Sequence, residues 1–206
     1  MSNISTKEEM LERLNSYAGS PDDDSILFKE FVKRELLDCP ELLFVLNNKE
    51  YEDQLFNEDG TINEDGDWDL YFNDNIRPYL YFPESQTDVK NFLSYKIEFE
   101  EIPRYNGFEK IARIYFVVLC DIKTIIDVNT GIARHDLISS ILRERFHWSN
   151  IFGTQCKIVS NKETVTDSNY VTRTLILELT MPNSVVQTNN SVSRVINNTV
   201  RTGVRG

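Results

Sequence analysis

Apolar and polar residues alternate along the middle of the chain in a pattern that predicts β-strands. From Phe92 to Glu101 every second residue is apolar, which is typical of a strand with one buried face. From Ile111 to Ile122 one face is apolar throughout and the other is partly apolar, which indicates a central strand covered on both sides. Two more strands are predicted from Gln155 to Ser160 and from Val171 to Thr180.

A helix is predicted between the second and third of these strands, from Arg134 to Phe146. Its apolar residues recur at helical spacing along one stripe, namely at Leu137, Ile138, Ile141, Leu142 and Phe146. The order strand, strand, helix, strand, strand predicts an α+β fold with a mixed or antiparallel β-sheet. We assign this α+β core to residues 90–181. The chain is expected to add an N-terminal helical segment, a connector and an extended C-terminal arm, at residues 1–50, 51–89 and 182–206.

The N-terminal segment is expected to hold three short helices, at residues 5–17, 25–37 and 41–47. Capping residues precede the first two, and a proline separates the second from the third. All three are too short and too apolar to be stable alone, so they must pack on the sheet or on a neighbouring subunit.

The connector contains an acidic stretch, residues 57–69, that resembles a calcium loop at first sight. Aligning either of its two glycines with the loop glycine of an EF-hand leaves one or both end ligand positions without an oxygen donor. Asp-Gly pairs are also strong turn formers, so we interpret the stretch as an exposed hairpin or loop. We therefore predict that Asp59, Asp65 and Asp67 bind calcium weakly or not at all.

Two aromatic or β-branched segments are candidates for a subunit interface. The connector is dense in aromatic residues, including Trp68, Tyr71 and Phe72, which would fill an interface or cover the domain's own core. The C-terminal arm is rich in valine, has no acidic residue and carries three arginines. The alternatives for it are disorder and an arm that becomes ordered on a partner. The arm residues that we assign to the interface are Arg194, Val195, Ile196, Arg201 and Arg205.

Composition and charge are typical of one soluble domain and do not indicate a surface that binds nucleic acid. The net charge is −11, and counting along the sequence gives −15 for residues 1–89, +1 for residues 90–180 and +3 for the remainder. A general nucleic-acid binder needs a clustered basic face, which this distribution does not provide. No apolar run is long enough for a membrane helix, and no secretory signal is expected. Three cysteines without CxxC spacing are expected to be buried free thiols.

Candidate catalytic groups are few. His135 and His147 are too far apart in the sequence to share a helix face as metal ligands, and we expect them to cap or pack. Asp121 and Lys123 resemble half of a metal-dependent nuclease motif, but the partner Glu-x-Lys is absent, since Lys96 and Glu98 occur in reversed order. No catalytic, cofactor-binding or metal-binding residue is therefore predicted, and neither is any cofactor.

The pattern of elements resembles the neck and tail-completion proteins of tailed bacteriophages, the tail-terminator group in particular. The residues that carry this resemblance are Ile111 to Asp121, Arg134 to Ile138 with Ile141 and Leu142, and Arg173 to Leu179. The segment from Leu27 to Asn48 is similar in style to neck proteins of crAss-like phages.

This resemblance implies a non-enzymatic virion protein that forms a homo-oligomeric ring of six or twelve copies. Its expected partners are the portal and other neck or tail proteins, with genomic DNA passing through an acidic lumen without specific binding and with no membrane contact. The protein would be made in the host cytoplasm and end in the virion neck. The alternatives are a metal-dependent enzyme acting on nucleic acid and a monomeric cytosolic adaptor or inhibitor.

Overall fold

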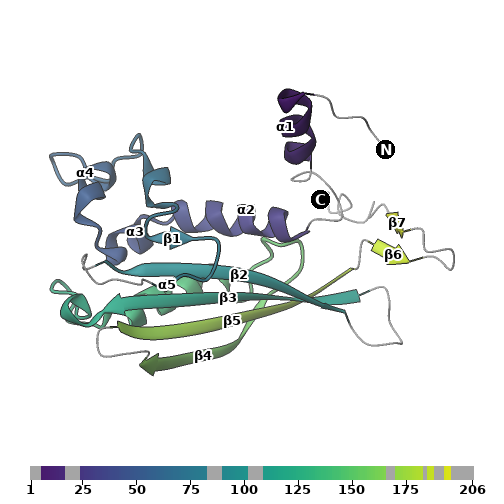
Figure 1. Cartoon of the computed structure of the whole chain (residues 1–206). Coiled ribbons are helices and arrows are strands. Elements are labelled where there is room, and N and C mark those ends of the chain that lie inside the picture. Colours follow the sequence, from purple (N-terminus) through teal and green to yellow (C-terminus); the bar gives the residue numbers. More distant parts are fainter. Residues whose placement is uncertain are drawn as a thin grey trace, which may run out of the picture.

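A five-stranded β-sheet with helices on one face forms the centre of the molecule (Figure 1). The computed structural model describes residues 6–16, 24–82, 90–101, 109–165, 170–182, 185–187 and 193–195. The sheet order is β1-β2-β3-β5-β4, and the strands are β1 (Ile76–Arg77), β2 (Phe92–Glu101), β3 (Glu109–Asp121), β4 (Lys157–Val165) and β5 (Tyr170–Pro182).

The strand connections confirm the predicted α+β class and make the sheet mixed. Neighbouring pairs among β2, β3, β5 and β4 are antiparallel, whereas β1 runs parallel to β2. Strand β3 is central, as its apolar pattern predicted. The sequence did not predict β1, because a strand of two residues is too short to show a period.

The helices are α1 (Lys7–Ser16), α2 (Asp24–Leu37), α3 (Pro40–Leu46), α4 (Glu52–Leu55) and α5 (Arg134–Phe146). Short 3-10 turns occupy residues 49–51, 68–71 and 122–124. Helix α3 begins with a proline, whose fixed φ suits the first helical position, and it ends at Asn47 in the left-handed conformation. Helix α5 has the bounds that its apolar stripe predicted.

One hydrophobic core lies between the sheet and the helices. Side chains from one face of β2, β3 and β5 meet α2, α3 and α5, and the largest of these fully buried side chains are Tyr95, Phe28, Phe116, Phe146, Leu36, Leu42, Leu43, Leu46 and Leu93. The opposite face carries a second, small cluster of Phe92, Val117, Leu119 and Tyr170, against which Tyr81 packs. The prediction that β3 is covered on both sides is confirmed for Phe116 to Asp121, which are buried on both faces, whereas the second face of the first half of the strand is partly accessible.

The connector belongs to the same core as the sheet. Leu55, Tyr71 and Ile76 are buried together with the helix and strand residues, so the expected boundaries of the connector do not separate independent bodies. The acidic stretch forms two turns, as predicted, and Phe56 and Ile62 form an antiparallel bridge across the first of them. The second turn needs Gly66, because an added Cβ would lie 1.9 Å from the carbonyl oxygen of Gln54.

The C-terminal arm contains a two-stranded antiparallel sheet of β6 (Val185–Gln187) and β7 (Ser193–Val195). Figure 1 shows this hairpin beyond the end of the main sheet at which β5 finishes. The two valine-containing segments of the arm therefore pair with each other within the chain.

Candidate functional site

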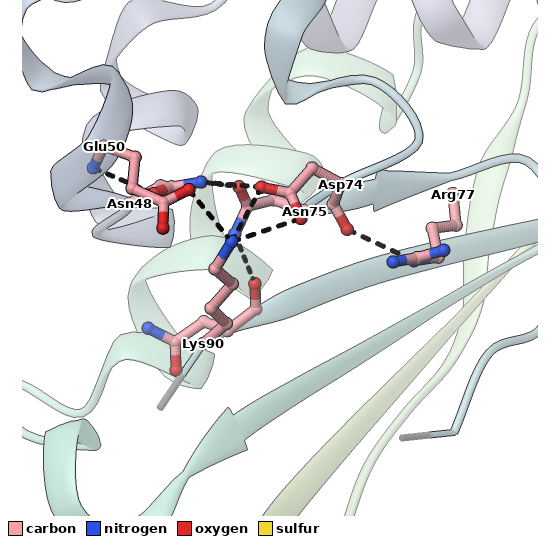
Figure 2. Close-up of polar contacts among 7 residues, drawn as sticks. Asn48, Glu50, Asp74, Asn75, Arg77 and Lys90 are labelled. Carbon is pink, nitrogen blue, oxygen red and sulfur yellow. Dashed lines mark hydrogen bonds and ion pairs between the residues drawn. The ribbon is translucent and has the colours of Figure 1, made fainter. Parts of the chain in front are cut away.

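Three buried asparagines and a lysine form a polar network at one end of the sheet (Figure 2). The side-chain amide of Asn48 donates to Asn75 Oδ1 at 2.6 Å and to Asp74 Oδ2 at 2.9 Å. Asn75 in turn donates to the carbonyl oxygen of Asn91 at 2.9 Å. Lys90 Nζ lies 3.2 Å from Asp74 Oδ2, so each buried amide has partners and the nearby charges are paired.

This asparagine network joins four parts of the chain. Asn48 follows α3, Asn75 precedes β1, and Asn91 precedes β2. Asn91 also donates to the carbonyl oxygen of Leu46 at 3.1 Å and accepts from the backbone N–H of Asp121, at the end of β3, at 3.2 Å. The network therefore fixes the connector against the sheet, which is a structural role.

The electrostatics of Lys90 agree with a structural role. Figure 2 shows its ammonium between Glu50 and Asp74, and its distance to Glu50 Oε2 is 3.3 Å. Burial alone would lower the pKa of Lys90, but hydrogen bonds and charges from Asp74 and Glu50 raise it. A lysine nucleophile or base needs a lowered pKa, so this lysine acts as a fixed cation.

A second cluster lies at the N-terminus of α5 and contains a group of residues that could hold a metal ion. His135 Nε2 lies 3.1 Å from Glu163 Oε2 and 3.7 Å from Asp136 Oδ1. Ligand atoms of the three residues all lie within 4.8 Å of one another, and they are the one such group in the part of the chain that the structure describes. His135 is buried, whereas the two carboxylates are accessible.

Arg173 already neutralises the carboxylates of this cluster. Its guanidinium pairs with Asp136 and lies 3.0 Å from Glu163 Oε2. The hydrogen bond and charge of His135, together with the charge of Arg173, lower the pKa of Glu163. A metal ion would have to displace a guanidinium from both of its anionic ligands, so the donor set fits an ion-pair cluster better than a metal centre.

A buried ion pair holds the segment between β3 and α5. Arg134 Nη2 lies 2.9 Å from Asp127 Oδ1, and both side chains are almost fully buried. Arg134 also donates to the carbonyl oxygens of Thr124 at 2.8 Å and of Val45 at 3.2 Å. Asp127 accepts hydrogen bonds from the backbone and hydroxyl of Thr130, both at 2.9 Å, and these bonds help to lower its pKa despite burial.

The segment that this ion pair stabilises displays apolar side chains to solvent. We call residues 122–133 the apolar loop, because Ile122, Ile126, Val128 and Ile132 are all exposed, Val128 by 87%. A cleft of about 430 Å³ lies beside it, and its lining includes Phe44, Lys123, Ile126 and Val128. Where exposed apolar side chains form one contiguous patch, they mark a surface that contacts another protein.

Comparison with known protein families identifies the family to which the chain belongs. The sequence matches the YomW family over residues 40–179, which is more than half of its length. The chain belongs to the YomW family. The family is named like a gene product of the Bacillus phage SPBc2, which indicates a phage-associated protein and agrees with the phage origin that the resemblance implied. No curated protein matches the sequence. The matched residues of this YomW-family chain include both polar clusters and the apolar loop, but neither α1 nor the C-terminal arm.

The YomW-family structure separates the predicted interface residues into three groups. Tyr71 is fully buried in the chain's own core, so its prediction as an interface residue is wrong. Its ring packs among the apolar side chains of the core beneath the connector. Trp68 and Phe72 also pack against this core but remain partly accessible. Arg194 and Val195 lie in β7, where the structure describes only the backbone, and Ile196, Arg201 and Arg205 lie outside the described residues.

The candidate catalytic residues of the YomW-family chain do not come together. Asp121 accepts a hydrogen bond from the backbone N–H of Lys123 at 2.7 Å, which caps the 3-10 turn after β3. Lys96 pairs in register with Tyr115, six residues before Asp121 on β3, so the two halves of the nuclease pattern are about 20 Å apart. His147 Nδ1 accepts from the backbone N–H of Ile158 at 3.0 Å, and the three cysteines are buried and free, as predicted.

The sequence does not mark the apolar loop as a functional candidate. Within the loop, Ile126 and Ala133 form an isolated antiparallel bridge. The available signal was the run of β-branched residues with polar neighbours, Ile125-Ile126-Asp127-Val128. Such a run also fits a buried strand, and only the position of the loop beyond the sheet makes it exposed.

The acidic turns of the YomW-family connector support a prediction on calcium. Asp59 Oδ1 already accepts from the backbone and hydroxyl of Thr61, at 2.9 and 2.6 Å. We expect titration calorimetry to show no calcium binding tighter than roughly 10 micromolar, the weak end of the sensor EF-hands. A Kd below that value that rises on Asp59→Asn, Asp65→Asn or Asp67→Asn would contradict the prediction, and Glu109→Gln in β3 provides a control for general charge effects.

Proposed function

We propose that this phage-associated protein is a non-enzymatic subunit of the virion, one copy in an oligomeric ring of the neck that joins portal to tail and lines the DNA channel. The observation that carries this proposal is the ordered apolar surface left outside the core. Helix α1 has no buried residue, and the apolar loop exposes four β-branched side chains. In an assembly of protein subunits, a neighbouring copy would cover these apolar side chains.

The charge distribution supports a channel through which DNA passes without binding. Many of the described cations are already paired with carboxylates, including Lys33, Lys49, Lys90, Lys96, Arg113, Arg134, Arg145 and Arg173. The acidic excess stays with the first 89 residues. An acidic, ion-paired surface repels a phosphate backbone, which favours sliding over retention.

The two polar clusters support the non-enzymatic part of the proposal. In each of them the groups that could serve chemistry are used in ion pairs and hydrogen bonds that connect separate segments. Lys90 is held as a cation, and Arg173 occupies the carboxylates beside His135. Both arrangements stabilise the fold that an assembly subunit requires.

Deletion of the arm tests the proposal. We expect a chain lacking residues 183–206 to keep its thermal midpoint, because the arm lies outside the main sheet, and to be lost from particles. Purified virions from a complemented deletion phage would be analysed by mass spectrometry. A matched full-length variant with Arg194→Lys, Arg201→Lys and Arg205→Lys keeps the charge and is expected to be incorporated.

One result would exclude an assembly role for the arm, and another would contradict the neck assignment. Incorporation of the truncated protein into infectious virions would exclude an assembly role for the arm. Absence of the full-length protein from purified virions would exclude a neck subunit altogether and would favour an adaptor or an enzyme of the infected cell.

A further inference from the structure

We propose that helix α1 of one copy binds the apolar loop and its neighbouring cleft on a second copy, and that this contact builds the ring. This inference rests on the proposed function. Its two surfaces belong to the same chain, and each lacks a covering partner among the described residues of that chain.

Helix α1 is an amphipathic helix without a buried side. The Met10, Leu11 and Leu14 side chains share one stripe and are 47–55% exposed. Thr6 and Glu9 form a reciprocal capping box, in which each backbone N–H donates to the other side chain at 3.1 Å. A ten-residue helix is marginal in water even when capped, so a second surface that covers this stripe would stabilise it.

The receiving surface has a backbone held by a buried ion pair and a cleft of suitable size. Phe44, Ile126 and Val128 supply the apolar part of the lining of the cleft of about 430 Å³, and its other lining residues are polar or charged. The buried pair of Asp127 and Arg134 fixes the backbone beneath them. A volume of this size accommodates three side chains such as those of the α1 stripe. Amphipathic helices commonly bind partners in this way, with apolar anchors on one stripe set against the apolar side chains of a cleft and the polar residues of the helix at its rim.

The charges beside the two surfaces are complementary. Glu8 and Glu12 are four residues apart on α1 and form an exposed acidic flank next to the apolar stripe. At the rim of the cleft, Lys49 is paired with Glu52 at 2.9 Å, whereas Lys123 is exposed and has no carboxylate partner among the residues that the structure describes. Docking would place the acidic flank near Lys123 and set the direction of the helix.

The positions of the two surfaces indicate that the apolar loop binds α1 of a second copy and not α1 of its own chain. The start of α2 lies over Phe99, since the rings of Phe28 and Phe99 are 5.7 Å apart, whereas the apolar loop follows the opposite end of the sheet at Asp121. Figure 1 shows α1 near the start of α2 and the start of α5 at the other end.

Contacts between opposite ends of identical subunits are heterologous. Each copy then offers α1 to one neighbour and the apolar loop to the other, and such contacts close into a ring when the rotation between copies permits it. A two-fold dimer would instead require the same patch on both copies. The proposed contact is therefore the kind that a ring needs.

Disulfide trapping between copies tests the contact. One purified full-length variant carries Leu14→Cys and a second carries Val128→Cys, both at exposed positions, and the three native cysteines are buried. After mixing and mild oxidation at high protein concentration, we expect mass spectrometry to detect a dimer linked through the two introduced cysteines. In the control mixture Val159→Cys replaces Val128→Cys. Val159 lies on β4 and is 52% exposed, and we expect at least tenfold less of the linked dimer.

The charge complementarity gives a second readout. Lys123→Glu in the Val128→Cys copy is expected to lower the yield of the linked dimer severalfold, and Glu12→Lys in the Leu14→Cys copy is expected to restore it. A yield no higher than that of the Val159→Cys control would overturn the inference. So would a single chain carrying both Leu14→Cys and Val128→Cys that closes an internal disulfide at every protein concentration.

The outcome for the contact is separate from the outcome for the function. If the trapped dimer fails to form while the protein is found in purified virions, the proposed contact is wrong and the neck assignment stands. If the dimer forms but the protein is absent from virions, the contact stands and the neck assignment is wrong.

Discussion

Replacing Arg134 with alanine is expected to lower the free energy of unfolding by about 3–5 kcal/mol, as when one partner of a buried ion pair is removed. The substitution would leave the carboxylate of Asp127 buried without its counter-ion. It would also remove the donor to the carbonyl oxygens of Thr124 and Val45. Urea denaturation followed by circular dichroism at neutral pH measures the change, and an equal m-value in both proteins shows that the extent of unfolding is the same.

Two controls distinguish the ion pair from a general effect of truncation. In an Asp127→Asn background, Arg134→Ala is expected to cost clearly less, because no charge is left unpaired. The pair should also show a defined pH dependence. The folded-state pKa of Asp127 is lowered, so its contribution is present above the unfolded value of about 3.9 and is lost as the pH falls through the lower folded value. An equal cost of Arg134→Ala in both backgrounds would show that the pair is not coupled.

Replacing Leu142 with alanine is expected to cost about 2–5 kcal/mol, since it opens a cavity in the core. Leu142 is fully buried on α5 in the same cluster as Phe116 and Leu177 from the sheet. Alanine has the higher helix propensity, so the loss would report packing and not helix formation. Thermal unfolding measures the effect.

The matched control is Ser140→Ala on the exposed side of the same helix, for which we expect a change within about 0.5 kcal/mol. A thermal midpoint that is unchanged by Leu142→Ala would remove this residue from the core. It would also contradict the packing of α5 on the sheet.

The candidate surfaces could be predicted from the sequence only in part. The helical spacing of Met10, Leu11 and Leu14 indicates an apolar stripe on α1, but the sequence does not show that no other described part of the chain buries it. Tyr71 and Trp68 carried the same aromatic signal, and yet one is fully buried and the other is partly accessible. Their exposure depends on how the connector folds back onto the sheet, which the local pattern does not encode.

Local periodicity determined the strands and helices that bury one regular face. The bounds of β2 and α5 follow from alternation and from a helical stripe, because in both elements the spacing of apolar residues matches the geometry of the backbone. The tertiary structure alone decided the contacts between distant residues. Arg134 reaches the carbonyl oxygen of Val45 across 89 positions, and Asn91 reaches that of Leu46 across 45. Single polar residues carry no period, and their partners become defined only when the sheet brings the segments together.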